Sequence, residues 1–241
     1  MTKTKYLFLF LVLSALLSLS CVCFAQNAEN SDNNFFEEDF SDDFNNHSWE
    51  KYMLLGDPNG AFYHIQRHRL SFELPTRGDV NMIFYNTAFA PSNVRVQAEF
   101  ENIRFTSAAY SVICRFTKDG WYELRVNAGG SEAGSYKLLK YDAYMKEKGF
   151  NPYTTVHKGM DRYFSNDINL RVGGTNKLEL ICYNDSFRVF INDVEQIPSK
   201  NNNVFSDDIF TEGSVGFSGL SFNDFMTEFD ITHFEAEVYE P

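Results

Sequence analysis

Apolar and polar residues alternate through the last two-thirds of the chain, and the clearest run covers residues 121–127. One parity of this run holds Tyr122, Leu124 and Val126. The other parity holds Trp121, Glu123, Arg125 and Asn127. Because successive side chains of a strand point to opposite faces, the run predicts a strand with a core face and a polar face that carries an aromatic ring.

Short strands separated by turns are predicted along most of the chain. They are 35–44, 61–66, 69–73, 80–85, 93–102, 108–116, 121–127, 135–141, 177–183, 187–192, 214–219 and 228–239. Asp57-Pro58-Asn59-Gly60 and Lys118-Asp119-Gly120 are typical turn sequences. Trp49 is expected to pack on the core, and residues 145–166 form a predicted long surface loop. Without long helical periodicity, the pattern predicts an all-β fold, a two-sheet antiparallel β-sandwich of the jelly-roll type.

The N-terminus has the pattern of an export signal. Lys3 and Lys5 precede an apolar run, and small residues flank a cleavage point before Gln26. Residues 1–25 are therefore the predicted signal peptide, 26–34 a flexible polar leader, and 35–241 one β-sandwich domain. A second interpretation is lipidation at Cys21, because residues 17–21 loosely match a bacterial lipobox. The chain is expected to be secreted, periplasmic or attached to the cell surface.

The charge of the chain limits its partners. The formal net charge is −12, and loss of Lys3 and Lys5 makes the balance more negative. Nucleic acids and anionic lipid surfaces attract a basic patch, so both are disfavoured as partners. No membrane insertion is expected after signal cleavage. With 44% hydrophobic residues, 25 Phe and 13 Tyr, the chain is rich enough in apolar residues for a packed core.

Two cysteines, Cys114 and Cys182, follow the predicted signal peptide. Both lie on the apolar parity of predicted strands, beside Val112 and Leu180 respectively. An exported chain meets an oxidising compartment in which a disulfide persists. Either a disulfide or two buried thiols fits the pattern.

Several phrases resemble the concanavalin A-like lectin/glucanase superfamily, above all its laminin-G-like jelly rolls and 3-keto-disaccharide hydrolase-like domains. The phrases are Asp39-Phe40-Ser41-Asp42-Asp43-Phe44, Val112-Ile113-Cys114-Arg115-Phe116, Asp119-Gly120-Trp121-Tyr122-Glu123-Leu124, Asn176-Lys177-Leu178-Glu179-Leu180, Phe187-Arg188-Val189-Phe190-Ile191-Asn192-Asp193 and Gly213-Ser214-Val215-Gly216-Phe217. The resemblance covers about residues 35–240. It implies a jelly roll and, by analogy, saccharide binding or cleavage, because one fold serves many functions.

The polar parity of three predicted strands offers a candidate glycan surface. If strands 93–102, 108–116 and 121–127 are neighbours, they present acids, arginines and one indole on a single face. Sugar sites combine an aromatic platform with polar groups. The candidate ligand-binding residues are Trp121, Glu123, Arg125, Arg115 and Glu99, with Tyr141 and Tyr153 from an aromatic loop region. The alternative is a solvated face with cross-strand ion pairs.

Catalysis has weak support in the sequence. Glu99 and Glu123 would form a glycosidase pair only if they faced each other, and nearby Arg115 and Arg125 would hold both acids ionised. The Glu-x-Asp-x-x-Glu run that the resemblance implies for glucanases has its nearest match at 228–233, where His233 replaces the last acid. No catalytic residue is therefore assigned.

Acidic residues near both chain ends suggest a structural calcium ion. Carboxylates are hard ligands that calcium prefers, and Asp39, Asp42 and Asp43 would meet Asp224 or Asp230 if the first and last strands pair. The alternative is an acidic edge that discourages aggregation. No other cofactor is expected.

The sequence thus favours a secreted or surface-attached, non-catalytic, lectin-like carbohydrate-binding module whose partner is a glycan or an envelope polysaccharide. A structural or protein-interaction domain of the cell envelope is the first alternative. A glycoside-processing hydrolase is the second.

Overall fold

The computed structural model describes residues 34–41, 47–57, 59–74, 79–104, 108–156, 161–197, 205–222 and 226–241. They belong to one compact unit, Asn34–Pro241. The predicted signal peptide, nearly all of the leader, Cys21, Asp42, Asp43 and Asp224 lie outside these described residues. No described helix has the length and hydropathy that a bilayer crossing requires.

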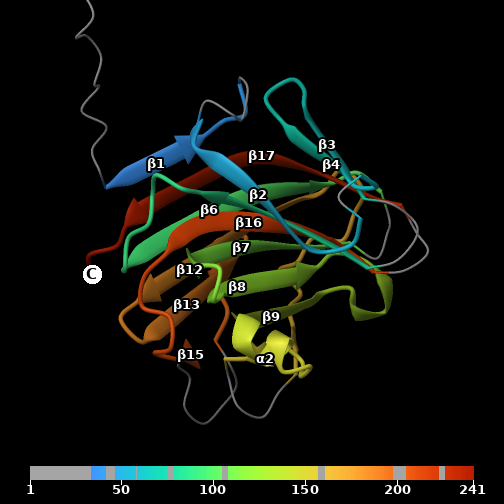
Figure 1. Cartoon of the computed structure of the whole chain (residues 1–241). Helices are drawn as coiled ribbons and strands as arrows, with labels where there is room; N and C mark the ends of the chain where they lie inside the picture. Colours follow the sequence, from blue (N-terminus) through green and yellow to red (C-terminus); the bar gives the residue numbers. More distant parts are fainter. Residues whose placement is uncertain are drawn as a thin grey trace, which may run out of the picture. The chain divides into compact units, whose positions relative to one another are not determined.

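Two antiparallel sheets make up the unit (Figure 1). Sheet A contains β1 (Phe35–Glu38), β3 (Phe62–Ile65), β4 (Leu70–Leu74), β6 (Val94–Asn102), β12 (Thr175–Tyr183), β13 (Ser186–Ile191), β14 (Val194–Glu195), β15 (Phe205–Ser206) and β17 (Thr227–Val238). Its main order is β14-β13-β12-β6-β17-β4-β3, with β1 paired to β17 and β15 to β13.

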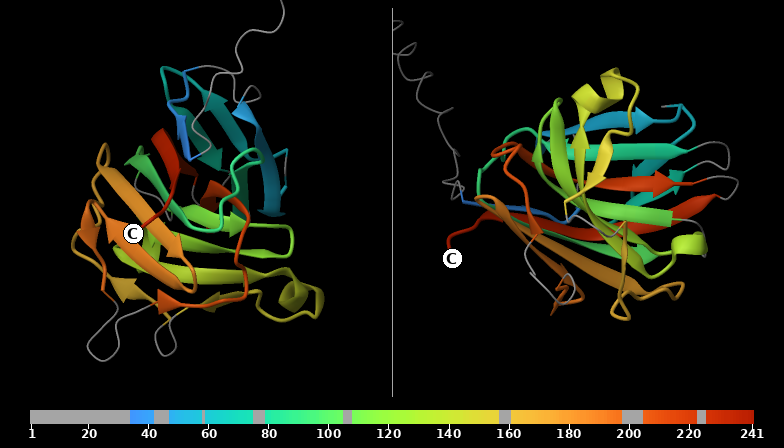
Figure 2. Two further views of the ribbon diagram at one scale, coloured as in Figure 1. Left: turned by 90° about the vertical axis from the view of Figure 1, so that its left-hand side faces the viewer. Right: turned by 90° about the horizontal axis from the view of Figure 1, so that it is seen from below.

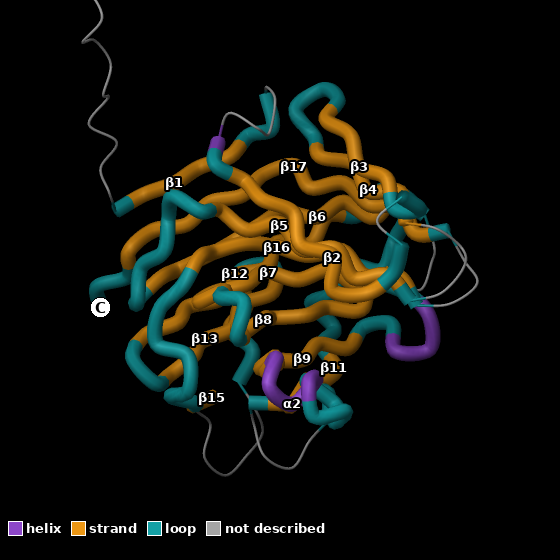
Figure 3. Tube along the Cα trace, viewed as in Figure 1, coloured by secondary structure: helices purple, strands orange, loops and turns teal. Residues whose placement is uncertain are grey.

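Sheet B lies across the core from sheet A, and Figure 2 shows the sandwich from two further sides. It contains β2 (Trp49–Leu55), β5 (Val80–Asn86), β7 (Ala108–Phe116), β8 (Gly120–Asn127), β9 (Ser135–Asp142), β10 (Tyr153–Thr155), β11 (Tyr163–Phe164) and β16 (Ser214–Ser221). Its order is β10-β9-β8-β7-β16-β5-β2, with β11 paired to β9. Short helical turns are α2 (Ala143–Glu147) and Gly130–Glu132, so strands dominate the trace (Figure 3).

Aromatic rings from both sheets fill the space between them. Phe72 and Phe229 of sheet A stack with centroids 4.7 Å apart, and Phe84 and Phe217 of sheet B stack at 5.5 Å. Trp49 is buried in this core, as its sequence context predicts. Since burying each large ring removes 150–250 Å² of surface from water, these rings account for much of the packing. The predicted all-β sandwich is confirmed.

A disulfide joins the two sheets. Cys114 on β7 of sheet B bonds to Cys182 on β12 of sheet A, with the Cα atoms 6.8 Å apart. The sequence is compatible with either a disulfide or two buried thiols, and the structure contains the disulfide.

Four segments differ from the sequence prediction. The strand predicted at 35–44 ends at Glu38 as β1, and residues 39–41 lie outside any strand. Residues Trp49–Leu55 form β2, although their polar and apolar residues do not alternate cleanly. The predicted loop 145–166 contributes β10 and β11, which pair with β9 and extend sheet B. β7 has the predicted bounds, but a register shift in its pairing with β16 changes the parity near its end.

Candidate functional site

The side of sheet B that faces away from the core carries a second apolar cluster. Its buried members are Leu54, Ile83, Ile113, Phe116, Trp121 and Tyr141. Tyr52, Tyr85, Ala143 and Tyr153 pack against them while half-buried. We call this side the outer face of sheet B. The sequence predicts that the side chains on this face are polar. In the structure, aromatic rings cover most of the face instead.

Trp121 lies at the centre of this cluster and is 0% exposed. Its ring stacks on Tyr141 with centroids 3.9 Å apart and planes 14° apart, and it also contacts Phe116 and Tyr52. The expectation that Trp121 and Tyr141 present open rings to a sugar is therefore wrong. Each ring is covered by neighbours that come from other strands of the sheet.

Glu123 is held beneath these rings by two donors. Trp121 Nε1 donates to Glu123 Oε2 at 3.0 Å, and Arg125 Nη2 pairs with the other oxygen. Glu123 is 0% exposed. Because buried charges are stable only when paired and hydrogen-bonded, this triad explains how a carboxylate remains on a largely apolar face.

Arg125 connects the triad to Tyr153. Its guanidinium carbon lies 4.6 Å from the centre of the Tyr153 ring. Burial acts to lower the pKa of Arg125, but the charge of Glu123 and its hydrogen bond, together with the interactions with Tyr153, outweigh it, and the net direction is upward. Burial also raises the pKa of Tyr153, whose hydroxyl accepts from Asn81 Nδ2 at 3.0 Å. Arg125 is therefore a cation at all ordinary pH values, and Tyr153 is neutral.

Two polar atoms in this group have no partner. Among the described residues, Arg125 Nε and Asn81 Oδ1 are buried without a hydrogen bond. Arg125 is only 8% exposed and Asn81 only 1%. Buried polar atoms are nearly always paired in native proteins, and Gln97 Oε1 on β6 of sheet A is likewise buried without a hydrogen bond, so such atoms are not confined to this face.

Two adjoining hollows open above Arg125. The narrower, of about 290 Å³, is lined by residues that include Arg125, Asn127, Glu132, Lys137 and Phe222. The wider, of about 720 Å³, is lined by residues that include Arg125, Lys137, Tyr153, Thr155 and Arg162. Arg125 and Lys137 are common to both. Together the two hollows, which we call the Arg125 groove, follow the ends of β8, β9 and β10.

Charged residues line the rim of the groove. Glu132 lies between two cations, with Lys137 Nζ at 2.9 Å from one oxygen and Arg162 Nη1 at 2.6 Å from the other. Asn127 is fixed by Ser135 Oγ at 2.8 Å. Sequence reasoning missed Glu132, Lys137, Arg162 and Asn81 as site residues. For Lys137 a signal existed, because it shares the outer parity of Tyr141 in strand 135–141.

Arg115 does not reach this face. It has a positive φ of 55° in a β-bulge opposite β16. Its Nε donates to the Ser92 carbonyl at 3.0 Å and its Nη1 to the Phe210 carbonyl at 3.1 Å. The predicted parity of Arg115 is wrong because the bulge interrupts the alternation. The same bulge brings Phe116 to the outer cluster.

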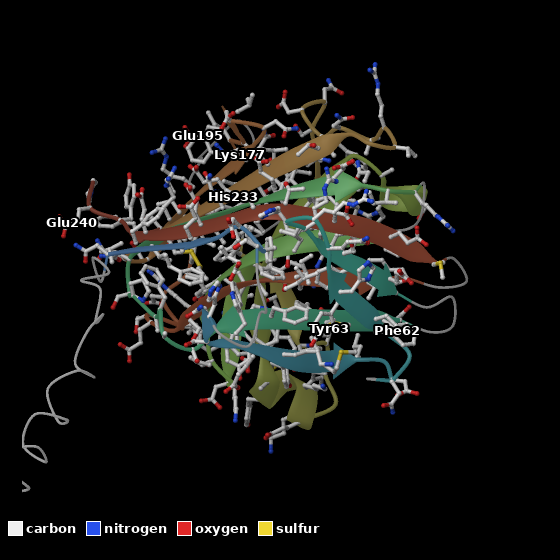
Figure 4. The ribbon with its side chains drawn as sticks, turned by 90° about the horizontal axis from the view of Figure 1, so that it is seen from above. Phe62, Tyr63, Lys177, Glu195, His233 and Glu240 are labelled. Atoms are coloured by element: carbon white, nitrogen blue, oxygen red, sulfur yellow. A yellow bond between two sulfur atoms is a disulfide. The ribbon has the colours of Figure 1, made fainter. Side chains whose placement is uncertain are left out.

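Glu99 lies in the other sheet. Its strand, β6, pairs with β12 and β17, and Glu99 is opposite Lys177 and His233. The strands carrying Glu99 and Glu123 are therefore not neighbours, and the two acids do not form a pair across one face. Lys177, His233 and nearby Glu195 belong to sheet A (Figure 4).

The outer face of sheet A is covered by ion pairs. Arg95 contacts Glu179, Glu235 and Glu237 within 3.2 Å. Arg69 contacts Glu101 and Asp230, and Arg104 contacts Glu228. The solvated, ion-paired face that the sequence analysis gives as an alternative thus exists, but on sheet A. Glu228 and Asp230 of the glucanase-like run are engaged in it.

The acidic residues proposed for calcium are only partly described. β1 and β17 pair, as expected. Asp39 is exposed, with one oxygen accepting from the Ser41 backbone at 2.9 Å, and Asp230 lies 3.3 Å from Arg69. Within the described ranges, no group of three or more His, Cys, Asp or Glu residues could hold a metal ion. A cation at Asp230 would compete with the guanidinium of Arg69.

Comparison with known proteins finds similarity of fold. No protein-family model matches the sequence, and no curated protein matches it. The laminarinase catalytic domain of Thermotoga maritima MSB8 is 7% identical with a TM-score of 0.57, over 86% of this chain and 98% of that one. A Bacillus licheniformis β-glucanase is 9% identical with a TM-score of 0.54, over 85% and 98%.

A Bacillus subtilis protein with a galectin-like fold is 12% identical with a TM-score of 0.54, over 84% of this chain and 94% of that one. Such low identities carry information about the fold alone. The chain has the concanavalin A-like fold, which is the fold that the resemblance in its sequence implies.

Proposed function

We propose that this chain is a secreted or surface-attached, non-catalytic carbohydrate-binding module that holds a glycan in the Arg125 groove. Export would use residues 1–25 as a cleaved signal peptide or, in the alternative, lipidation of a retained Cys21 would attach the chain to the membrane. One observation carries the proposal. A nine-tenths-buried arginine lines both hollows and has a donor, Nε, without a partner among the described residues.

An unpaired buried donor is expensive to keep. Leaving such a group unsatisfied costs about 1–3 kcal/mol, and a ligand oxygen that contacts Nε after the covering side chains move would recover part of this. Sugar hydroxyls and ring oxygens are suitable acceptors. Tyr153, beside Arg125, supplies an aromatic surface, and Thr154 and Thr155 supply further polar groups along the wider hollow. Its volume of about 720 Å³ is within the usual ~300–1,000 Å³ of ligand sites.

The arrangement of carboxylates favours binding over hydrolysis. Glycosidases place two carboxyl groups about 5–9.5 Å apart. The described strands of sheet B contain three acids, Glu50, Glu123 and Asp142. Glu50 on β2 accepts from the Tyr85 hydroxyl, and Glu123 on β8 is occupied by Trp121 and Arg125. Asp142 caps α2 by accepting from Tyr144 and Met145. Release of reducing sugar from a bound glycan would contradict this part of the proposal.

A glycan array tests the proposal on the mature protein, residues 26–241. It is run with calcium and again with EDTA, which also tests the proposed calcium ion. We expect binding to a defined glycan class that Lys137→Gln weakens. The matched control is Lys177→Gln, because Lys177 pairs with Asp193 at 2.8 Å on the outer side of sheet A, much as Lys137 pairs with Glu132. Equal losses in both variants, or no binding by folded protein, would contradict the proposal.

Exposed aromatic rings favour a second candidate, a protein-interaction domain of the cell envelope. Tyr144 is 62% exposed and Phe150 is 63% exposed, and both lie in or beside α2. Aromatic residues are frequent anchors of protein interfaces. If the array is negative, capture of an envelope partner that is lost in a Tyr144→Ser/Phe150→Ser double variant would support this candidate.

A further inference from the structure

Positively charged residues gather at the Arg125 groove, although the chain as a whole is acidic. The sequence has 33 acids and 21 lysines and arginines. Yet Arg125, Lys137 and Arg162 converge on the wider hollow, and two of them also lie within 3 Å of Glu132. In an acidic protein, three cations around one hollow indicate a local need for positive charge.

Three described acids, Glu123, Glu132 and Asp161, match these cations in number, and the first two form ion pairs with them. Glu123 pairs with Arg125 below the hollow, so that pair is neutral. Glu132 is then the one carboxylate shared by Lys137 and Arg162. Asp161 also lines the wider hollow, but it is exposed, where water and salt screen its charge. Among the described residues, the Lys137–Glu132–Arg162 cluster itself therefore contains two cations and one acid.

The unpartnered Nε of Arg125 adds a directional donor to this surplus charge. A guanidinium presents its N–H groups in a planar fork, which matches the oxygens of a carboxylate or a sulfate better than isolated hydroxyls. Tyr153 covers one side of the guanidinium and so restricts the directions from which a ligand oxygen can approach.

We infer that the Arg125 groove binds an anionic saccharide, a glycan bearing carboxylates or sulfate esters. The anionic group would accept from Arg125 Nε and interact with Lys137. The inference rests on the proposed function and narrows it from glycans in general to charged ones. Uronates and sulfated sugars share this chemistry, and the experiment below separates them.

Binding of the mature protein is measured by titration calorimetry against polygalacturonate, a sulfated galactan and neutral galactan, all in EDTA. We expect binding to at least one charged polymer to be about tenfold tighter than to neutral galactan. Raising sodium chloride from about 50 mM to about 500 mM should weaken it strongly, because salt screens the attraction. The charged polymer that binds identifies the source of the anion.

Two variants connect this preference to the groove. Lys137→Gln should lower affinity for the charged polymer about tenfold and leave affinity for neutral galactan unchanged, whereas Lys177→Gln should change neither. Arg125→Lys keeps the charge but removes Nε, and should also lower affinity for the charged polymer. Circular dichroism verifies that each variant is folded.

The possible failures are distinguishable. If the protein binds neutral galactan or a neutral glycan from the array as tightly as the charged polymers, the anionic inference is overturned and the proposed function stands. If it binds no glycan at all, both fail. A charged preference that is salt-independent, or that survives both groove variants, also overturns the inference.

Discussion

The two outer faces of this sandwich use the same kinds of charged residue in opposite ways. On sheet A, Arg95 is half-buried and lies among Glu179, Glu235 and Glu237, where water reaches the cluster. On sheet B, Arg125 and Glu123 form an isolated pair under Tyr153 and Trp121. Exposed pairs contribute little because water screens them, whereas a covered pair fixes one geometry at a cost in desolvation. Under the proposed function, the covered face of sheet B is the one that holds the ligand.

The largest expected effect comes from breaking the covered pair. Glu123→Ala leaves Arg125 buried without its countercharge and removes the acceptor of Trp121 Nε1. We expect the free energy of unfolding to fall by about 4 kcal/mol, measured by urea denaturation. Glu179→Ala on sheet A is the control. There Arg95 keeps Glu235 and Glu237, and burial raises the pKa of Glu179, so its removal should cost well under half as much. Equal losses would erase the contrast between the faces.

The next largest effect is expected from removing the disulfide that joins the two sheets. Cys114 and Cys182 are 68 residues apart in sequence and link β7 to β12. A Cys114→Ala/Cys182→Ala variant should lose about 3 kcal/mol in the same denaturation experiment. Both cysteines are replaced so that no free thiol remains. A loss below about 1 kcal/mol would mean that packing between the sheets suffices without the disulfide.

A pH titration extends the comparison to a third charged pair. Asp207 accepts from Lys140 Nζ at 2.8 Å and from the Tyr122 hydroxyl. Burial acts to raise the pKa of Asp207, but these hydrogen bonds outweigh it and the pKa lies below its usual value. A carboxyl with a depressed folded-state pKa stabilises the fold above its unfolded pKa of about 4, and the contribution is lost as pH falls through the folded-state pKa.

Asp207→Asn should therefore lower the free energy of unfolding by about 1–2 kcal/mol at pH 7. The difference from the parent protein should shrink steadily as the pH falls below about 4. Urea denaturation at a series of pH values measures it. If the difference in free energy of unfolding between the variant and the parent protein is the same at every pH, then Asp207 stabilises the fold through packing and not through its charge.

The smallest effect is expected on the exposed side of sheet A. Arg188 and Glu195 form an ion pair with N–O distances of 2.7 and 3.0 Å, and both side chains are more than one-third exposed. Arg188→Ala should change the free energy of unfolding by no more than about 0.5 kcal/mol, and less in high salt. A loss comparable to that of Glu123→Ala would contradict the view that sheet A's charges are solvated.

The alternation of residues predicted most strands and the fold, because period-two burial is a local property of the sequence. Strand 108–116 has its predicted bounds. Arg115 nevertheless does not lie on the predicted face, because a single β-bulge reverses the alternation of side chains at this point. The residue types in the strand do not predict that bulge. Parity also cannot tell in which sheet a strand lies, and so Glu99 was grouped with Glu123 although β6 is in sheet A.

Burial of the polar face depends on contacts that are distant in sequence. Trp121 is covered by Tyr141 and Tyr52, and Arg125 by Tyr153 of a segment that reads as a loop. The sequence of a strand therefore does not predict whether its outward-facing side chains contact water or are covered by an aromatic ring from another strand. Arg125 and Tyr153 were nevertheless named from the sequence, and both line the groove.

Hydrogen–deuterium exchange tests the central claim most directly, using the mature protein with and without the glycan that the array selects. The account predicts that the ligand slows exchange in 129–137 and 151–156, around the Arg125 groove, and leaves the amides of β12, β13 and β17 unchanged. Slowing confined to those strands of sheet A, with none around the groove, would contradict the assignment of the binding face.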